Sequence, residues 1–73
     1  MIVVPPMRRI EELRREYPTG CKIILDFMDD KNAPPKGTRG TVIGVDDLGG
    51  IIVRWDNGSM LSVIDGVDRC HRV

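Results

Sequence analysis

Aromatic residues are scarce in this sequence, which has one Trp, one Tyr and one Phe among 73 residues. Grooves that bind polyproline segments are lined by several aromatic side chains, and so are surfaces that bind single-stranded nucleic acid by base stacking. Neither a polyproline groove nor a base-stacking surface is therefore expected.

An excess of charge of either sign is also absent. Eleven Lys and Arg residues balance eleven Asp and Glu residues, so the formal net charge is zero. Nucleic-acid-binding domains are usually basic, because Lys and Arg neutralise phosphates. The balance argues against a strongly basic binding domain and leaves open a local basic patch.

Soft metal ligands are few: two cysteines and one histidine. A structural zinc site usually needs four Cys or His ligands, and two cysteines are too few for a disulfide framework. Cys70 and His71 are adjacent in an expected strand and point to opposite faces, which argues against a Cys–His nucleophile pair. We expect Cys21 and Cys70 to be small buried side chains, and we predict no metal, cofactor or catalytic residue.

Long hydrophobic runs are missing as well. The opening MIVVPPM is too short for the core of a signal peptide, and no later stretch approaches the length that spans a bilayer. We therefore expect a soluble cytoplasmic protein. A chain of 73 residues holds one small hydrophobic core, so residues 1–73 are predicted to form a single domain.

The first element is predicted to be an amphipathic helix over residues 5–17. Pro5 and Pro6 mark its start, because proline is favoured in the first helical turn. Met7, Ile10, Leu13 and Tyr17 recur at spacings of three and four and share one face, which is expected to pack on the rest of the domain.

After Gly20 the pattern alternates with a period of two, which is typical of β-strands. In the first strand Cys21, Ile23, Leu25 and Phe27 are expected on the core side. Asp56-Asn57-Gly58 is the strongest hairpin signal, and Asn-Gly favours a type I′ turn. The strands are predicted at residues 21–28, 40–45, 51–55, 59–64 and 67–73.

Five short strands with a long first loop, from Asp29 to Thr38, are typical of a small closed barrel. The predicted fold class is mainly all-β: a five-stranded SH3-like barrel over residues 20–73, preceded by the helix. The helix is expected to cap an open end of the barrel or to lie across one face.

Seven runs of the chain carry a family resemblance: Ile10-Glu11-Glu12-Leu13-Arg14, Tyr17-Pro18-Thr19-Gly20, Met28-Asp29-Asp30, the run from Ala33 to Val42, Gly44-Val45-Asp46-Asp47, Trp55-Asp56-Asn57-Gly58-Ser59 and Gly66-Val67-Asp68. In these runs the chain resembles a family of small bacterial and phage proteins that share a domain of unknown function. The resemblance covers nearly the whole chain and implies an SH3-like fold, without catalytic residues. The setting of such proteins in Firmicutes and mobile elements hints at a DNA-linked or host-interaction role.

The acidic pairs and glycine loops have simple structural interpretations. Asp29-Asp30 and Asp46-Asp47 are interpreted as turn formers, because Asp bonds to its own backbone and the regular spacing of a calcium loop is absent. The glycine-containing loops lack the Lys-Ser/Thr ending of a phosphate-binding loop. Trp55 is expected either in the core or at the barrel rim, with its indole N–H reaching a partner.

Long loops on a rigid scaffold often carry function. We therefore predict a non-enzymatic protein–protein binding module whose surface includes the Asp29–Arg39 loop, Trp55, Asp56 and the rim near Asp46-Asp47. A weak homodimer through a strand edge or the helix is a further expectation. The alternative is nucleic-acid binding by the Lys31–Arg39 loop. The predicted binding residues are Asp29, Asp30, Lys36, Arg39, Trp55 and Asp56.

Overall fold

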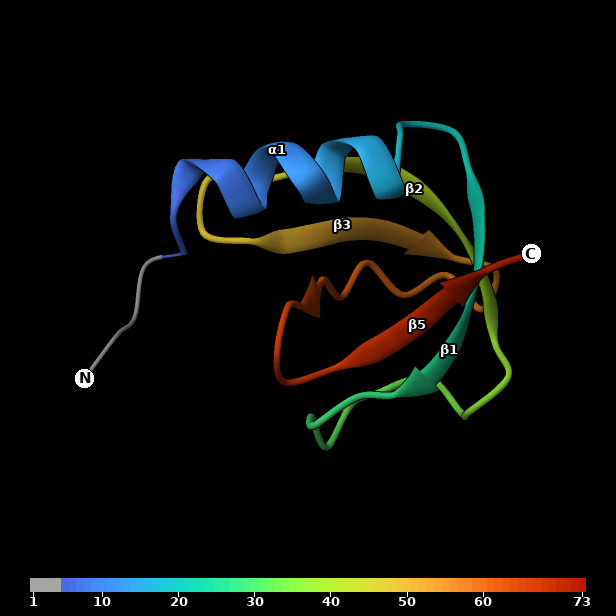
Figure 1. Cartoon of the computed structure of the whole chain (residues 1–73). Helices are drawn as coiled ribbons and strands as arrows, with labels where there is room; N and C mark the ends of the chain where they lie inside the picture. Colours follow the sequence, from blue (N-terminus) through green and yellow to red (C-terminus); the bar gives the residue numbers. More distant parts are fainter. Residues whose placement is uncertain (1–4) are drawn as a thin grey trace.

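The computed structural model describes residues 5–73 and shows one helix on one antiparallel sheet (Figure 1). Residues 1–4, on which part of the expectation about a leader rests, lie outside the described residues. The elements are α1 (Met7–Glu16), β1 (Lys22–Phe27), β2 (Arg39–Val45), β3 (Gly50–Trp55), β4 (Val63–Ile64) and β5 (Arg69–Arg72). The predicted mainly-β class is confirmed.

The strand order is β4-β3-β2-β1-β5, so β4 and β5 are the two ends of the sheet. The sheet curls until β4 and β5 touch, yet no ladder pairs them within residues 5–73. The expected closure into a barrel is therefore wrong. The fourth strand was expected over residues 59–64 but contains only Val63 and Ile64. Part of the reason is that the Leu61 carbonyl, which precedes it, accepts the indole N–H of Trp55 at 2.9 Å.

Helix α1 is shorter than predicted, with Pro6 as an extended N-cap residue and Tyr17 as the C-cap residue. Ile10 and Leu13 are buried as expected. Met7 is 59% exposed, so its predicted core position is wrong. Pro5 and Ile10, rather than Met7, are the residues that cover the β2–β3 turn at Gly49.

The inner face of the sheet forms the core under α1. Eight side chains from α1 and the first four strands make one buried cluster, and Tyr17, Cys21 and Cys70 pack against it. The alternation in β1 is confirmed for Ile23 and Leu25. The buried residues of the cluster are Leu13, Ile23, Leu25, Val42, Ile51, Val53, Trp55 and Val63.

Phe27 departs from that alternation and is 46% exposed, so its predicted core position is wrong. The register between β1 and β5 shifts between Leu25 and Phe27, and such a bulge changes the direction of the side chains that follow it. The ring of Phe27 instead lies under the guanidinium of Arg69, 5.7 Å from ring centroid to Cζ.

The Asp56-Asn57-Gly58 turn forms as expected but with different geometry. Gly58 donates to the Trp55 carbonyl at 2.9 Å, and the Trp55 N–H donates to the Ser59 carbonyl at 2.9 Å. Gly58 has φ +90°, whereas no non-glycine residue in 5–73 has positive φ, so Asn57 cannot be in a type I′ turn. The turn is a three-residue loop with glycine in the left-handed position.

Candidate functional site

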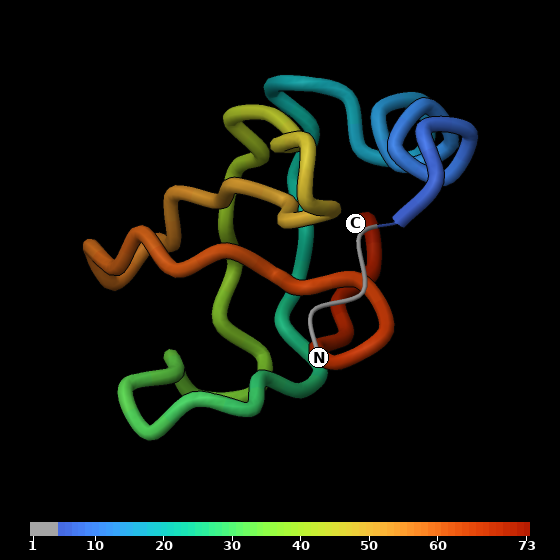
Figure 2. Tube along the Cα trace, turned by 90° about the vertical axis from the view of Figure 1, so that its left-hand side faces the viewer, coloured from blue at the N-terminus to red at the C-terminus, as the bar shows by residue number. Residues whose placement is uncertain are grey.

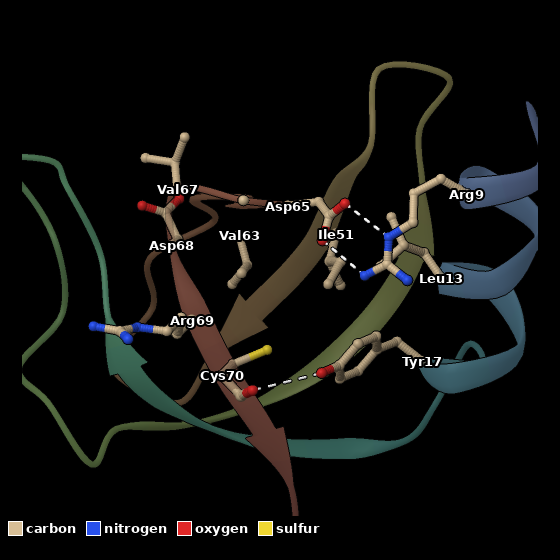
Figure 3. Close-up of a pocket in the computed structure, with 11 residues that line it drawn as sticks. Arg9, Leu13, Tyr17, Ile51, Val63, Asp65, Val67, Asp68, Arg69 and Cys70 are labelled. Atoms are coloured by element: carbon tan, nitrogen blue, oxygen red, sulfur yellow. Dashed lines mark hydrogen bonds and ion pairs between the residues drawn. The ribbon is translucent and has the colours of Figure 1, made fainter. Parts of the chain in front are cut away.

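A pocket of about 350 Å³ lies between α1, the β4–β5 turn and β5 (Figure 3). Its floor is apolar and consists of Leu13, Ile51 and Val63, which are all buried. Tyr17 and Cys70 form one wall. Its volume falls within the range of small-ligand pockets, at roughly 300–1,000 Å³.

The rim of the pocket carries a two-pronged ion pair between the helix and the β4–β5 turn. Arg9 Nε and Nη2 each donate to a carboxylate oxygen of Asp65 at 2.8 Å (Figure 3). Arg9 also contacts Glu12 at 3.3 Å and Glu16 at 3.6 Å. The hydrogen bond from Arg9 holds the pKa of Asp65 below its ordinary value, and the same bond raises the pKa of Arg9.

Replacing Asp65 with asparagine is expected to destabilise the domain by about 1 kcal/mol at pH 7, the upper end for a partly exposed ion pair. The pKa of Asp65 is lower in the folded protein than in the unfolded chain. The ion pair therefore stabilises the fold fully above the unfolded-state pKa near 4, and this stabilisation is lost as the pH falls through the folded-state pKa. Urea denaturation of wild type and Asp65→Asn at pH 7 and at pH 3 measures the loss of stability and its decrease at low pH.

Asp47→Asn is the matched control, because the Asp47 side chain is 86% exposed in its pair with Arg14 and should change stability little. A difference between wild type and Asp65→Asn that is as large at pH 3 as at pH 7 would contradict the assignment of the effect to the ion pair.

Cys70 points its thiol into the pocket (Figure 3). Burial raises the pKa of this thiol to about 11. The Tyr17 hydroxyl donates to the Cys70 carbonyl at 3.5 Å, at the long limit of a hydrogen bond, and burial raises the pKa of Tyr17 as well. At neutral pH both side chains are uncharged, so this wall of the pocket offers no nucleophilic thiolate.

Asp68 fixes the backbone beneath the pocket. This residue is 8% exposed, and its carboxylate accepts the N–H of Asp29 at 2.8 Å and the N–H of Ile64 at 2.9 Å. These two bonds tie the start of the long loop to β4. The pocket therefore rests on a constrained turn.

The residues predicted as a binding surface lie elsewhere. The long loop and the β3–β4 turn are at the side of the molecule away from α1 (Figure 2). Asp30 accepts the N–H of Asn32 at 2.7 Å, which supports its interpretation as a turn former. The Asp46 carboxylate likewise accepts the backbone N–H groups of Leu48 at 2.9 Å and Gly50 at 2.8 Å. Asp47 pairs with Arg14 on the helix, so the rim near Asp46-Asp47 lies beside α1.

Two positions were left open for Trp55, the core and the barrel rim. In the structure Trp55 lies in the core, where it is 1% exposed. Its predicted role at an exposed binding surface is therefore wrong. Asp29, Lys36, Arg39 and Asp56 are exposed.

The two cysteines are less buried than expected. Cys21 and Cys70 are free thiols, each partly buried. His71 points its Nδ1 to the Asp26 carboxylate at 2.8 Å on the exposed face, away from the pocket. Within residues 5–73, no three His, Cys, Asp or Glu side chains are grouped as a metal site. The one helix of this part of the chain lacks the length and apolar character needed to cross a membrane.

Sequence reasoning did not find the pocket. Leu13 and Tyr17 were expected only on the apolar face of the helix, and Ile51 and Val63 only within strands. No role was predicted for Arg9 or Asp65. They are joined by tertiary structure: Arg9 and Asp65 are 56 positions apart in the chain. The one local signal was the apolar helix face that ends at Tyr17.

The described residues thus form a small mainly-β domain with one helix and a pocket whose floor is apolar. Residues 7–73 match the model of a family described as "Domain of unknown function (DUF4314)", and the chain belongs to that family. No curated protein matches the chain, and no solved structure does.

Proposed function

We propose that this chain is a non-enzymatic protein-binding module of SH3-like topology. Support for the topology comes from the long loop between β1 and β2, the antiparallel run of β2, β3 and β4, and the return of β5 to β1. Support for a role without catalysis comes from β5, where Cys70 faces the core and His71 faces Asp26 on the other side. A nucleophile and its base need to meet on one side.

The pocket is the proposed binding site, and an extended segment of a partner protein is the proposed occupant. The observation that carries this is that the pocket lies along an unpaired edge of β5. Leu25 donates to Thr38 at 2.9 Å and accepts from Gly37 at 2.8 Å, both on the β2 side. Leu25 is also the register partner of Cys70 in β5. Because the backbone N–H and C=O of Leu25 both point toward β2, these two residues form a non-hydrogen-bonded pair, and the backbone N–H and C=O of Cys70 point away from β1.

A peptide strand added beside β5 would form hydrogen bonds with the backbone N–H and C=O of Cys70. These bonds would replace the long hydrogen bond from the Tyr17 hydroxyl to the Cys70 carbonyl. Strand addition gives affinity through main-chain hydrogen bonds and specificity through pockets for alternate side chains. An apolar side chain of the added strand would enter the pocket and cover Val63 and Ile51. The ion pair of Arg9 and Asp65 would remain at the rim.

Origin in a bacterium, a phage or a mobile element, and a place in the cytoplasm, are part of the same proposal. The family resemblance supports the origin. The two free, partly buried thiols of Cys21 and Cys70 are consistent with a reducing compartment.

The test is an amide-resolved NMR titration with a set of blocked hexapeptides that vary one apolar residue between threonines. Saturable shifts at Cys70, Arg72 and Val63 are expected for part of the set. Val67→Trp should abolish them, because Val67 lines the pocket and is 51% exposed, so a larger ring fills the pocket without entering the core. Leu48→Trp, at another exposed position, is the matched control and should leave binding unchanged.

Three outcomes contradict the proposal. The first is an absence of shifts with every peptide. The second is equal binding by Val67→Trp and wild type. The third is a set of concentration-dependent shifts along β5 without peptide, which would make a second copy of the chain the occupant.

A further inference from the structure

The outer face of the sheet gathers three cations around one hydroxyl. Thr41 on β2 is the register partner of Lys22 on β1 and of Arg54 on β3. Register partners share a face of the sheet, so these three residues form one row across three strands. Arg39 precedes Thr41 by two positions in β2 and lies on the same face.

This face points away from the core. The residues next to the row, Ile23, Val42 and Val53, are each 0% exposed and face the helix side. Lys22, Arg39 and Arg54 are exposed. Adjacent strands are about 4.8 Å apart, so the row from Arg54 to Lys22 spans about 10 Å.

The three cations have no acidic partner. Within residues 5–73 none of them makes an ion pair, whereas Arg8, Arg9 and Arg14 of the helix all do. Lys22 Nζ donates instead to Thr41 Oγ1 at 2.7 Å. This leaves three cations and a hydroxyl in reach of an external anion.

The nearby acids weaken the positive charge of this face only in part. The Asp26 carboxylate lies 2.8 Å from His71 Nδ1, and this histidine offsets its charge only when it is protonated. Asp56 donates its backbone N–H to the Arg39 carbonyl at 2.8 Å, but its carboxylate is not paired with the Arg39 guanidinium. Three cations without an ion pair thus stand against the two carboxylates of Asp26 and Asp56.

We propose that the face defined by Lys22, Arg39, Thr41 and Arg54 binds the phosphate backbone of duplex nucleic acid. The span of about 10 Å matches about three phosphates of one strand, at about 3.4 Å of axis each. No aromatic side chain belongs to the row, and base stacking is the usual means of holding single strands, so a duplex is the fitting partner. Contacts of this kind carry no base sequence information.

This face differs from the pocket, and it shares only Arg39, the first residue of β2, with the predicted loop surface. The zero net charge of the chain limits long-range attraction, so binding is expected to be weak at physiological salt and measurable at low salt.

Fluorescence anisotropy with a labelled 16-base-pair DNA duplex tests the proposal. Three neutralised phosphates give a salt slope of about −2.7, so raising KCl from 20 to 100 mM should weaken binding about 80-fold. The Lys22→Glu/Arg54→Glu double variant should lose at least tenfold in affinity at 20 mM. Lys31→Glu/Lys36→Glu makes the same charge change in the long loop and should bind within about twofold of wild type.

Circular dichroism of both double variants verifies folding, and an RNA duplex and the separated DNA strands are measured alongside. Equal binding of the RNA and DNA duplexes agrees with backbone recognition. The proposal is wrong if the duplex does not bind at 20 mM KCl, or if the loop variant loses as much affinity as the sheet variant. It is also wrong if single strands bind more tightly than the duplex, or if polyglutamate competes as well as unlabelled duplex, which would indicate an acidic protein partner.

Discussion

Trp55→Ala is expected to lower the melting temperature by about 15–30 °C, the largest effect of any single substitution considered. The ring is 1% exposed and its indole N–H is bonded to the Leu61 carbonyl at 2.9 Å. Removing a buried Trp side chain costs about 3–5 kcal/mol, and each kcal/mol lowers the melting temperature of a domain this small by about 4–8 °C. A domain of this length is only marginally stable, so a loss of this size leaves much of it unfolded.

Thermal denaturation followed by circular dichroism measures this effect. Trp55→Phe should be less damaging, because it keeps most of the buried volume and loses only the hydrogen bond to Leu61. Phe27→Ala is the control for an exposed aromatic and should change the melting temperature by only a few degrees. A Trp55→Ala protein that melts within about 5 °C of wild type would contradict the core position of this ring.

Gly40→Ala is the second large effect, and the reason is a lack of space. A Cβ atom at residue 40 would lie 2.5 Å from Val53 Cγ1 and 2.7 Å from Trp55 Cε3. Both neighbours are themselves buried, so neither can move aside cheaply. Overpacking of this kind costs about 1–3 kcal/mol or more, and here it also disturbs the pairing of β2 with β3.

Gly44→Ala in the same strand is a matched control. A Cβ at residue 44 meets nothing within 4 Å, and Gly44 is not among the glycines with positive φ. It is expected to be neutral or slightly stabilising, because alanine restricts the unfolded chain more than glycine does. Urea denaturation of the two variants separates them, and equal stabilities would contradict the close packing assigned to Gly40.

The two proposed surfaces lie on different sides of the sheet and need not exclude one another. The pocket uses the edge of β5 and the helix side, while the cation row uses the outer face of β1, β2 and β3. The Val67→Trp and Lys22→Glu/Arg54→Glu proteins therefore distinguish the two activities. Each variant should lose one kind of binding and keep the other.

The position of Phe27 shows where prediction from a periodic pattern fails. The alternation placed Ile23 and Leu25 in the core correctly, because a regular strand turns successive side chains to opposite faces. It failed at Phe27, since the bulge after Leu25 depends on how β5 pairs with β1. The predicted core position of Met7 failed for a similar reason, because the packing of the helix on the sheet decides which residues cover Gly49.

The row of Lys22, Thr41 and Arg54 was even harder to predict from the sequence. The basic residues could be listed from the sequence, but only the register of β1, β2 and β3 brings Lys22, Thr41 and Arg54 into one row. The long-loop lysines were the more visible candidates because they are close together in the chain. Proximity in sequence was a poor guide to proximity in the sheet.

The sequence by itself determined the mainly-β class, the position of the helix and most of the strands, and the turn at Asp56-Asn57-Gly58, because these depend on local periodicity and backbone preference. Tertiary structure alone decided that the sheet stays open between β4 and β5, that Arg9 meets Asp65, and that the pocket and the cation row exist. These features join residues that are distant in the chain. Their formation depends on register, bulges and the packing of the helix, which no local pattern specifies.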